Sequence, residues 1–155
     1  MARPRTFSSA LTGLLLALAA LHPSTAAGEG SRSPLFVLSA FEDAWAAGRA
    51  DLVEKTLAAE KIAMSLGDAG PQDEAYTRTQ AAYLIKDALA YRLTESFGFV
   101  EFYWSENGTA MPYGIARWEF RRSEGGPVRE VLLRVTLREE GPGWVVAEIK
   151  VQPPR

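Results

Sequence analysis

The spacing of apolar residues in the first half of the chain predicts helices. Ser33 followed by Pro34 is a typical helix start, and apolar residues then recur at helical spacing, at Leu35, Leu38, Phe41 and Trp45. This helix is expected to stop near Gly48, and a second short helix is expected to begin at about Asp51. The pattern then changes to alternation, which predicts a short strand with one face formed by Ile62, Met64 and Leu66.

A loop and a third helix come next. Residues 68–75 are rich in Gly, Pro and Asp, which is typical of a loop. Thr77 and Gln80 have the spacing of a capping box, in which two side chains bond each other's backbone N–H groups at a helix start. This helix is expected to run to about Tyr91, with a core-facing stripe formed by Ala81, Leu84, Ile85 and Ala88.

From Phe97 onward the apolar positions alternate, and three turn sequences interrupt them. These are ENGT at 106–109, SEGGP at 123–127 and EEGPG at 139–143. The second half is therefore predicted to be a four-stranded antiparallel meander. Helices first and a meander afterwards predict an α+β fold in which N-terminal helices pack on a curved antiparallel sheet.

The turns also predict the register of the meander. A two-residue Asn107-Gly108 turn and the two longer turns give these opposed pairs: Phe102 with Tyr113, Val100 with Ile115, Trp118 with Leu132, Leu137 with Val145, and Arg134 with Glu148. A slip of one residue would exchange the two faces of a strand.

This register divides the strands into two faces. The expected helix-facing core comprises Val100, Phe102, Trp104, Tyr113, Ile115, Val131, Leu133, Val135, Leu137, Val145, Ala147, Ile149 and Val151, with Arg117 and Glu119 as polar exceptions. The expected outer face is mixed but unusually aromatic. A contiguous exposed apolar patch usually marks an interaction surface, so we expect a homodimer or partner interface at Trp118, Phe120, Leu132, Tyr103, Phe99 and Trp144. The alternative is that a loop or the N-terminal segment covers these residues.

Arg117 is the most informative polar residue in this register, because alternation places it on the core side. A buried guanidinium needs a partner. One interpretation is a ligand pocket in which Arg117 anchors a carboxylate or phosphate, and whose other members are Tyr113, Phe102, Trp104 and Glu119. The other interpretation is an internal ion pair of Arg117 with Glu119 or Asp87.

Composition removes several classes of chemistry. The 155 residues include 17 basic and 19 acidic side chains, so nothing suggests nucleic-acid binding. There is no cysteine, which excludes disulfides and thiolate sites, and the single histidine, His22, lies in the N-terminal segment. Carboxylate catalysis by Asp43, Asp87 or Glu119 stays open, but surface acids are mostly solvated. We predict no catalytic residue, cofactor or metal.

The N-terminal segment has the pattern of a secretory signal peptide. Arg3 and Arg5 precede an apolar run at 11–21, and small residues follow it up to Ala27. A membrane-spanning helix needs about 20 apolar residues and is the less favoured alternative. We therefore expect a signal peptide at 1–27, a single α+β domain at 28–155 without a membrane span, and a periplasmic or secreted location, with the lack of disulfides favouring a bacterial periplasm.

Three stretches in this order, FEDAWAAGRADLVEKTL, YTRTQAAYLIKDAL and YGIARWEF, resemble the nuclear-transport-factor-2-like superfamily, a cystatin-like α+β cone. Within it the chain resembles an uncharacterised family of secreted bacterial proteins, a domain of unknown function. The resemblance spans about residues 34–151 and implies a pocket between sheet and helices and frequent dimerisation through the sheet.

The resemblance does not imply an activity, because the superfamily includes isomerases, dehydratases and binding modules. Our first hypothesis is a secreted, non-catalytic interaction module that forms a homodimer through the outer sheet face. The second is a small-ligand-binding protein, or a simple acid-base isomerase or dehydratase, with its pocket inside the cone.

Overall fold

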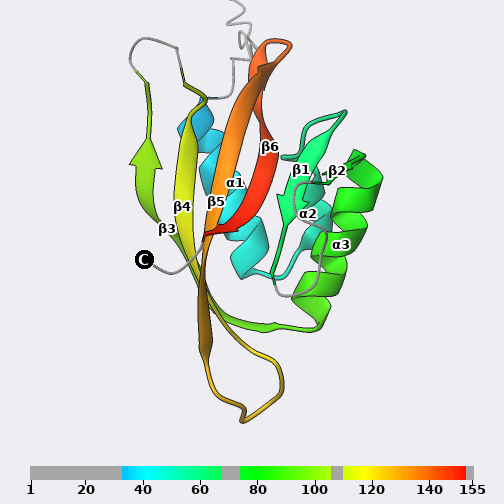
Figure 1. The fold of residues 1–155 in the computed structure, drawn as a ribbon, viewed down its shortest axis with the longest axis vertical. Coiled ribbons are helices and arrows are strands. Elements are labelled where there is room, and N and C mark those ends of the chain that lie inside the picture. The colour runs from blue at the N-terminus through cyan, green and yellow to red at the C-terminus, as the bar shows by residue number, and fades with distance from the viewer. Residues whose placement is uncertain (1–32, 68–73, 106–109, 153–155) are drawn as a thin grey trace, which may run out of the picture.

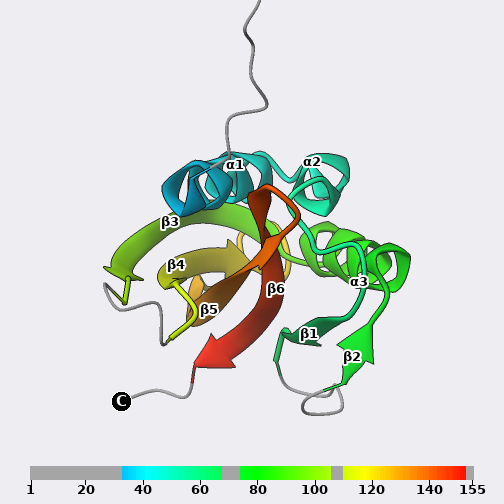
Figure 2. The same ribbon diagram turned by 90° about the horizontal axis from the view of Figure 1, so that it is seen from above.

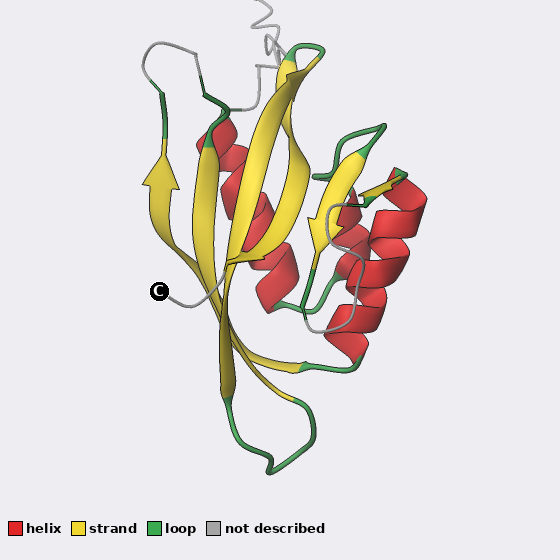
Figure 3. Cartoon of the chain, viewed as in Figure 1, coloured by secondary structure: helices red, strands yellow, loops and turns green. Residues whose placement is uncertain are grey.

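The structure is a computed structural model that describes residues 33–67, 74–105 and 110–152. Within these residues one curved sheet of six strands, in the order β2-β1-β6-β5-β4-β3, is covered by helices on one face (Figures 1 and 2). Helices and sheet form two layers around a shared core (Figure 3). This arrangement confirms the predicted α+β fold class.

The first and third helices begin where their capping residues predict, and the short second helix begins one residue before the predicted Asp51. They are α1 Pro34–Ala46, α2 Ala50–Glu54 and α3 Arg78–Ala90. The Ser33 hydroxyl accepts a hydrogen bond from the Phe36 N–H at 3.3 Å, and Thr77 and Gln80 form the predicted capping box at the start of α3. One residue of the predicted α1 stripe is wrong, because Leu35 is 59% exposed.

The strands are β1 Ile62–Ser65, β2 Ala75–Tyr76, β3 Leu93–Tyr103, β4 Tyr113–Arg121, β5 Arg129–Glu140 and β6 Gly143–Gln152. Strands β3 to β6 form the predicted antiparallel meander, although β3 begins earlier than Phe97. Strand β1 extends this sheet by pairing parallel to β6. The predicted turn at 106–109 and most of the predicted loop at 68–75 lie outside the described residues.

The predicted register is wrong by one or two residues at each pair of strands. Between β3 and β4, Tyr113 lies opposite Tyr103 rather than Phe102, and Val100 lies at an irregularity between Phe99 and Glu101. The other opposed pairs that replace the prediction are Trp118 with Val131, Leu137 with Val146, and Arg134 with Lys150. A second irregularity lies between Thr136 and Leu137, which shifts the register along β5 and β6.

These shifts exchange the faces of β3 and β4 while leaving β5 largely as predicted. Leu133, Val135 and Ile149 are buried in the core, as expected. In contrast, three predicted core residues of the third strand and its end are about half exposed: Val100 at 47%, Phe102 at 54% and Trp104 at 57%. On β6, Val146 is fully buried like Ile149, whereas Val145 and Ala147, which were predicted to be in the core, are only half-buried.

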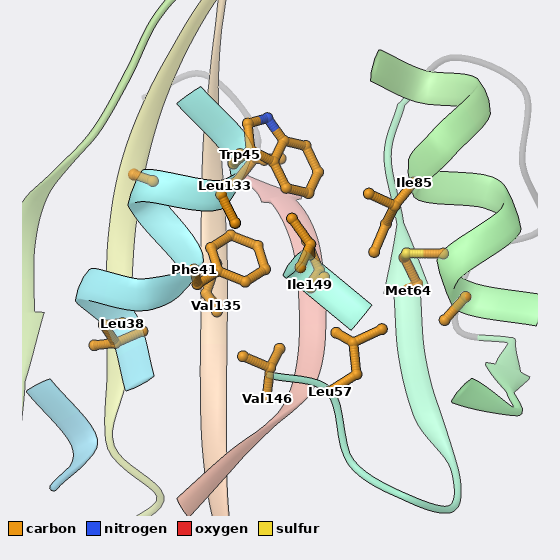
Figure 4. Packing of buried hydrophobic residues seen from close by; sticks show 14 of the residues in the cluster. Leu38, Phe41, Trp45, Leu57, Met64, Ile85, Leu133, Val135, Val146 and Ile149 are labelled. Carbon is orange, nitrogen blue, oxygen red and sulfur yellow. The ribbon is translucent and has the colours of Figure 1, made fainter. Parts of the chain in front are cut away.

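The centre of the core is an aromatic cluster between α1 and the sheet. Trp45 lies with its ring centroid 5.3 Å from those of Phe41 and Phe97, and it contacts Trp118 edge-on at 5.2 Å. Phe41 and Trp45 point from α1 toward Leu133 and the other aliphatic residues of the sheet (Figure 4). Burial of each such side chain contributes roughly 1.5–3 kcal/mol, which explains why the helices cover this face.

We predict that Gly114→Ala destabilises the protein, because a Cβ there would lie 2.5 Å from the ring of Phe99 and 3.4 Å from Leu38. Phe99 is held among other aromatic rings, so its displacement should cost about 1–3 kcal/mol. Gly98→Ala on the neighbouring strand is the matched control, since nothing lies within 4 Å of its Cβ position. Urea unfolding of both variants tests this, and equal midpoints would contradict it.

A carboxylate contact between distant parts of the chain ties the α2–β1 connection to β5. Glu140 accepts hydrogen bonds from the Ala59 N–H at 2.9 and 3.3 Å and lies 3.2 Å from the Arg138 guanidinium. Desolvation raises the pKa of the Glu140 carboxyl. The hydrogen bond from the Ala59 N–H and the hydrogen bond and charge of Arg138, together with the charge of Arg78, lower this pKa by more than desolvation raises it. The pKa of Glu140 therefore lies below its usual range.

This shift predicts a pH-dependent contribution to stability. A depressed folded-state pKa stabilises the protein above the unfolded-state pKa of about 4.3, and the contribution is lost as the pH falls through the folded-state pKa. Glu140→Gln should therefore lower the free energy of unfolding at neutral pH, and the difference from wild type should narrow below about pH 4. Urea titrations at both pH values test this, with the exposed Glu139→Gln as control; a pH-independent difference would contradict it.

Candidate ligand-binding cavity

Two adjoining hollows lie where α3 leads into β3. The first, which we call the apolar chamber, has a volume of about 290 Å³ and lies between β1 and the last turns of α3; its wall includes Met64, Leu66, Tyr76, Leu84, Asp87 and Ala88. The second, the arginine chamber, has a volume of about 410 Å³ and extends over the sheet; its wall includes Trp118, Phe120, Arg122, Arg129, Val131 and Val151. Leu66, Gly67 and Arg92 line both chambers.

Arg92 occupies the boundary between the chambers because of its place in the chain. Helix α3 ends at Ala90 and is capped by Tyr91, and β3 begins at Leu93, so Arg92 lies at the bend between helix and strand. Its guanidinium carbon is 5.5 Å from the ring centroids of both Trp118 and Phe120. A guanidinium at this distance is attracted to the faces of aromatic rings, which holds the side chain across the boundary.

The aromatic wall of the arginine chamber is rigid. Trp118 and Phe120 alternate along β4 and therefore face the helices together, with ring centroids 4.7 Å apart. Trp118 is fully buried, and its indole N–H donates to the Thr94 hydroxyl at 3.1 Å. These contacts fix the surface on which Arg92 rests.

Charges are distributed unequally between the chambers. The wall of the arginine chamber includes Arg92, Arg122 and Arg129, and one acidic residue, Glu130. Among the described residues, the Arg129 side chain makes no hydrogen bond or ion pair. The apolar chamber instead contains Asp87, which is half-buried. One end of the cavity is therefore cationic, and the other is apolar with a single carboxylate.

The hydroxyl group of Tyr76 in the apolar chamber is a hydrogen-bond donor rather than a base. Desolvation raises the pKa of Tyr76, and the hydrogen bond to Glu74 at 3.2 Å together with the Glu74 charge raises it further. The phenol stays protonated at neutral pH and donates to Glu74.

The predicted pocket around Arg117 is not formed. Because Ala116 and Trp118 face the core, Arg117 between them faces outward, and its side chain is 52% exposed. It pairs with Glu130 at 3.5 Å, rather than with Glu119 or Asp87. The pocket was predicted because Arg117 was expected to be buried and to need a partner, and this exposed position removes that argument.

The other predicted pocket residues are also distributed away from the cavity. Glu119 accepts a hydrogen bond from the Ser96 hydroxyl at 2.7 Å. Tyr113 is half-buried and stacks on Tyr103 at 4.5 Å. Phe102 and Trp104, about half exposed, lie at the far end of β3 from Arg92. The structure brings none of this predicted set to the chambers.

The residues predicted for the outer face are divided between the two faces. Trp118 and Phe120 are 0% and 4% exposed and belong to the core and the chamber wall, so their predicted exposure is wrong. Phe99 is partly buried against the same core. Three further members of the set retain exposed area: Tyr103 at 42%, and the half-buried Leu132 and Trp144.

Of the three carboxylates considered for catalysis, only Asp87 lines a chamber. Asp43 is exposed on α1, and Glu119 is engaged by Ser96. Arg92 and Arg129 were missed by the sequence reasoning. Arg129 would have been found with the correct register, since it lies opposite the inward-facing Phe120.

A third hollow, of about 470 Å³, lies on the surface of α2 and α3 and includes Asp51, Tyr83 and Lys86. Asp51 is already paired with Arg49 at 2.8 Å. Across residues 33–67, 74–105 and 110–152 no group of three or more His, Cys, Asp or Glu residues could hold a metal ion. No helix in the same ranges is long and apolar enough to cross a membrane.

Comparisons with protein-family models and with curated proteins find no match for this chain. Among solved structures, a DUF4783 family protein from Bacteroides uniformis is 10% identical, with a TM-score of 0.61 over 76% of this chain and 96% of the other. A hypothetical protein from Catenulispora acidiphila with a ketosteroid isomerase-like fold, in complex with trimethylamine, is 13% identical, with a TM-score of 0.57 over 78% of this chain and 86% of the other.

A nuclear-transport-factor-2-like protein of unknown function from Shewanella oneidensis is 13% identical, with a TM-score of 0.52 over 77% of this chain and 95% of the other. At identities this low, the structural similarity establishes the fold and leaves the function open. The chain therefore has the nuclear-transport-factor-2-like α+β fold, whose solved examples include bacterial proteins of unknown function.

Proposed function

We propose that this protein is a non-catalytic module that binds a small organic molecule with an apolar body in the apolar chamber beside Arg92. The observation that carries this proposal is a chamber walled by Met64, Leu66 and Leu84 that opens directly onto a guanidinium held against aromatic rings. Apolar walls with a few fixed polar groups are typical of small-molecule sites. A protein of the same fold is in complex with trimethylamine, which supports a ligand-binding role for a protein of this fold.

Binding is favoured over catalysis by the chemistry of the chamber. A general base needs a neighbour that orients it and a reach to the reacting proton. Among the described residues, the Asp87 carboxylate makes no hydrogen bond or ion pair that would orient it. Tyr76 is committed to Glu74. Acid-base catalysis through Asp87 is the alternative function. We expect an Asp87→Asn variant to bind the ligand with unchanged affinity, which would show that binding does not depend on the Asp87 carboxylate.

Titration calorimetry with decanol tests the proposal. We expect saturable binding of decanol by the wild type. Leu84→Gln should weaken it about tenfold, which corresponds to about 1.4 kcal/mol of lost apolar contact. Leu35→Gln is the matched control, because Leu35 is 59% exposed on α1 and lines neither chamber. Absence of saturable binding of both decanol and its charged analogue decanoate by the wild type would overturn the proposed function.

We further infer that the protein acts outside the cytoplasm. The support is the signal-peptide pattern at 1–27, which lies outside the described residues. Expression of the full chain in a bacterium, followed by mass measurement of the periplasmic protein, should give a chain beginning at Gly28. A full-length product that stays in the cytoplasm would contradict this inference.

A homodimer through the outer sheet face is a second candidate role. It is supported by Leu132 and by the stacked rings of Tyr103 and Tyr113 on this face. Strands β4 to β6 of the same sheet carry two ion pairs, Arg117 with Glu130 and Lys150 with Glu148. Leu132→Glu should convert a dimer to a monomer in native mass spectrometry, whereas Val128→Glu in the exposed β4–β5 connection should not. A wild-type protein that is monomeric at micromolar concentration would remove this candidate.

A further inference from the structure

We propose that the ligand of this cavity is an amphipathic anion, whose carboxylate-like headgroup binds Arg129 in the arginine chamber while its apolar body crosses Arg92 into the apolar chamber. This inference rests on the proposed function and adds the chemical class of the ligand. It is carried by the orientation of the arginines, by the pairing of the other charges and by the division of the cavity.

The register directs Arg129 toward the cavity. Arg129 lies directly opposite Phe120, and directly opposed residues of antiparallel strands share one face of the sheet. Phe120 is 4% exposed and faces the helices, so Arg129 lies on the same side and lines the arginine chamber.

The neighbouring arginine doublet is divided between two roles. Arg121 is used within the structure, because its Nε donates to Glu95 at 2.8 Å and its Nη1 donates to the Gly126 carbonyl. Arg122 instead lines the arginine chamber beside Phe120. A second guanidinium is thus placed near Arg129 on the side of the sheet that faces the cavity.

Arg129 differs from most of the other described arginines in its surroundings, although Arg134 likewise forms no ion pair and lies over the Tyr113 ring, 4.0 Å from its centroid. Arg49, Arg117, Arg121 and Arg138 each form an ion pair. Among the described residues, Arg129 forms none and donates no hydrogen bond. A guanidinium presents a planar set of donors that matches a carboxylate, so an anion is the partner that this position favours.

No carboxylate neutralises the arginine chamber from within its described wall. Glu130 is the acidic residue of that wall, but its carboxylate lies 3.5 Å from Arg117 Nε on the outer face. At the other end of the cavity, Asp87 would repel an anionic group. The headgroup is therefore directed to the arginines, and the apolar body to the chamber of Met64 and Leu84.

Arg92 sets the shape of such a ligand. Its side chain lines both chambers and rests on Trp118 and Phe120, so a molecule that reaches from one chamber to the other must pass beside it. A headgroup alone would occupy only the arginine chamber. An apolar chain joined to a single anionic group matches the polarity of the two chambers.

The test compares decanoate with decanol, which share an apolar chain and differ in headgroup charge. Titration calorimetry at pH 7.5 and low salt should show decanoate binding at least tenfold more tightly than decanol. Arg129→Gln should remove most of this preference for decanoate, and Arg122→Gln should reduce it. Arg49→Gln is the matched control, because Arg49 is an exposed arginine that is paired with Asp51 and lines neither chamber.

The outcomes separate this inference from the proposed function. If decanol and decanoate bind equally well to the wild type, the anionic headgroup is wrong and the proposed function stands. If Arg129→Gln leaves the preference for decanoate intact, the assignment of Arg129 is wrong. If neither compound binds, both the inference and the proposed function are wrong.

Discussion

Replacing Trp118 with Glu is expected to unfold the protein under conditions in which the wild type is fully folded. Trp118 is 0% exposed and contacts Trp45 edge-on at 5.2 Å and Phe120 at 4.7 Å. The substitution removes these contacts and places an unpaired carboxylate among aromatic rings. A lost large aromatic costs about 3–5 kcal/mol and the buried polar group adds to this, against a total stability of about 5–15 kcal/mol.

Far-UV circular dichroism and urea unfolding measure this effect. Tyr103→Glu is the control, because Tyr103 is 42% exposed near the end of β3 and should tolerate a charge. The sequence predicted that Trp118 and Tyr103 share one exposed surface, whereas in the structure Trp118 is buried and Tyr103 is exposed. A folded Trp118→Glu variant with wild-type stability would return Trp118 to the outer face and contradict the observed register.

Arg78→Met is expected to give the second-largest loss of stability. Arg78 begins α3, and its guanidinium donates to the Leu57 carbonyl at 2.8 Å and to the Ala58 carbonyl at 3.2 Å. Leu57 and Ala58 are both 0% exposed. Removing the donors leaves two carbonyls without these partners in a buried connection, which should cost about 2–3 kcal/mol.

Urea unfolding of three variants tests the role of Arg78. Arg78→Lys retains a charge but lacks the planar pair of donors, so its loss should be intermediate. Arg49→Met removes an exposed ion pair with Asp51 and should leave the unfolding midpoint nearly unchanged. Equal midpoints for Arg78→Met and Arg49→Met would show that the two carbonyl contacts contribute nothing.

The parts of the fold that were predicted correctly depend on local sequence. Ser33 and Pro34 start α1, and Thr77 and Gln80 start α3, because a capping side chain acts within three residues of itself. The alternating meander was also recognisable, because strand periodicity is a local property. These features were sufficient for the fold class.

The register could not be derived in the same way, because it depends on irregularities that have no local pattern. Val100 looks like any other strand residue, yet the pairing of β3 with β4 shifts beside it. The phenyl ring of Phe99 lies over Gly114, a contact that only the opposed strands create. One such shift reverses the direction of every side chain beyond it, which is why Arg117 was placed inside.

The candidate site was predictable in type but not in residues. A cavity between sheet and helices was expected, and an arginine was expected at it. Arg92, the arginine that lines both chambers, lies at a bend between helix and strand and belongs to neither periodic pattern. Its position against Trp118 and Phe120 requires the tertiary structure.

The most direct test of the ligand-binding cavity is a nuclear magnetic resonance titration of the ¹⁵N-labelled protein with decanoate, observed at the indole N–H groups of its four tryptophans. The Trp118 indole lines the arginine chamber, whereas Trp104 is 57% exposed and lines neither chamber. We predict that the Trp118 signal shifts saturably while the Trp104 signal stays in place. A shift confined to Trp104, or no saturable shift of Trp118, would contradict a binding site at this cavity.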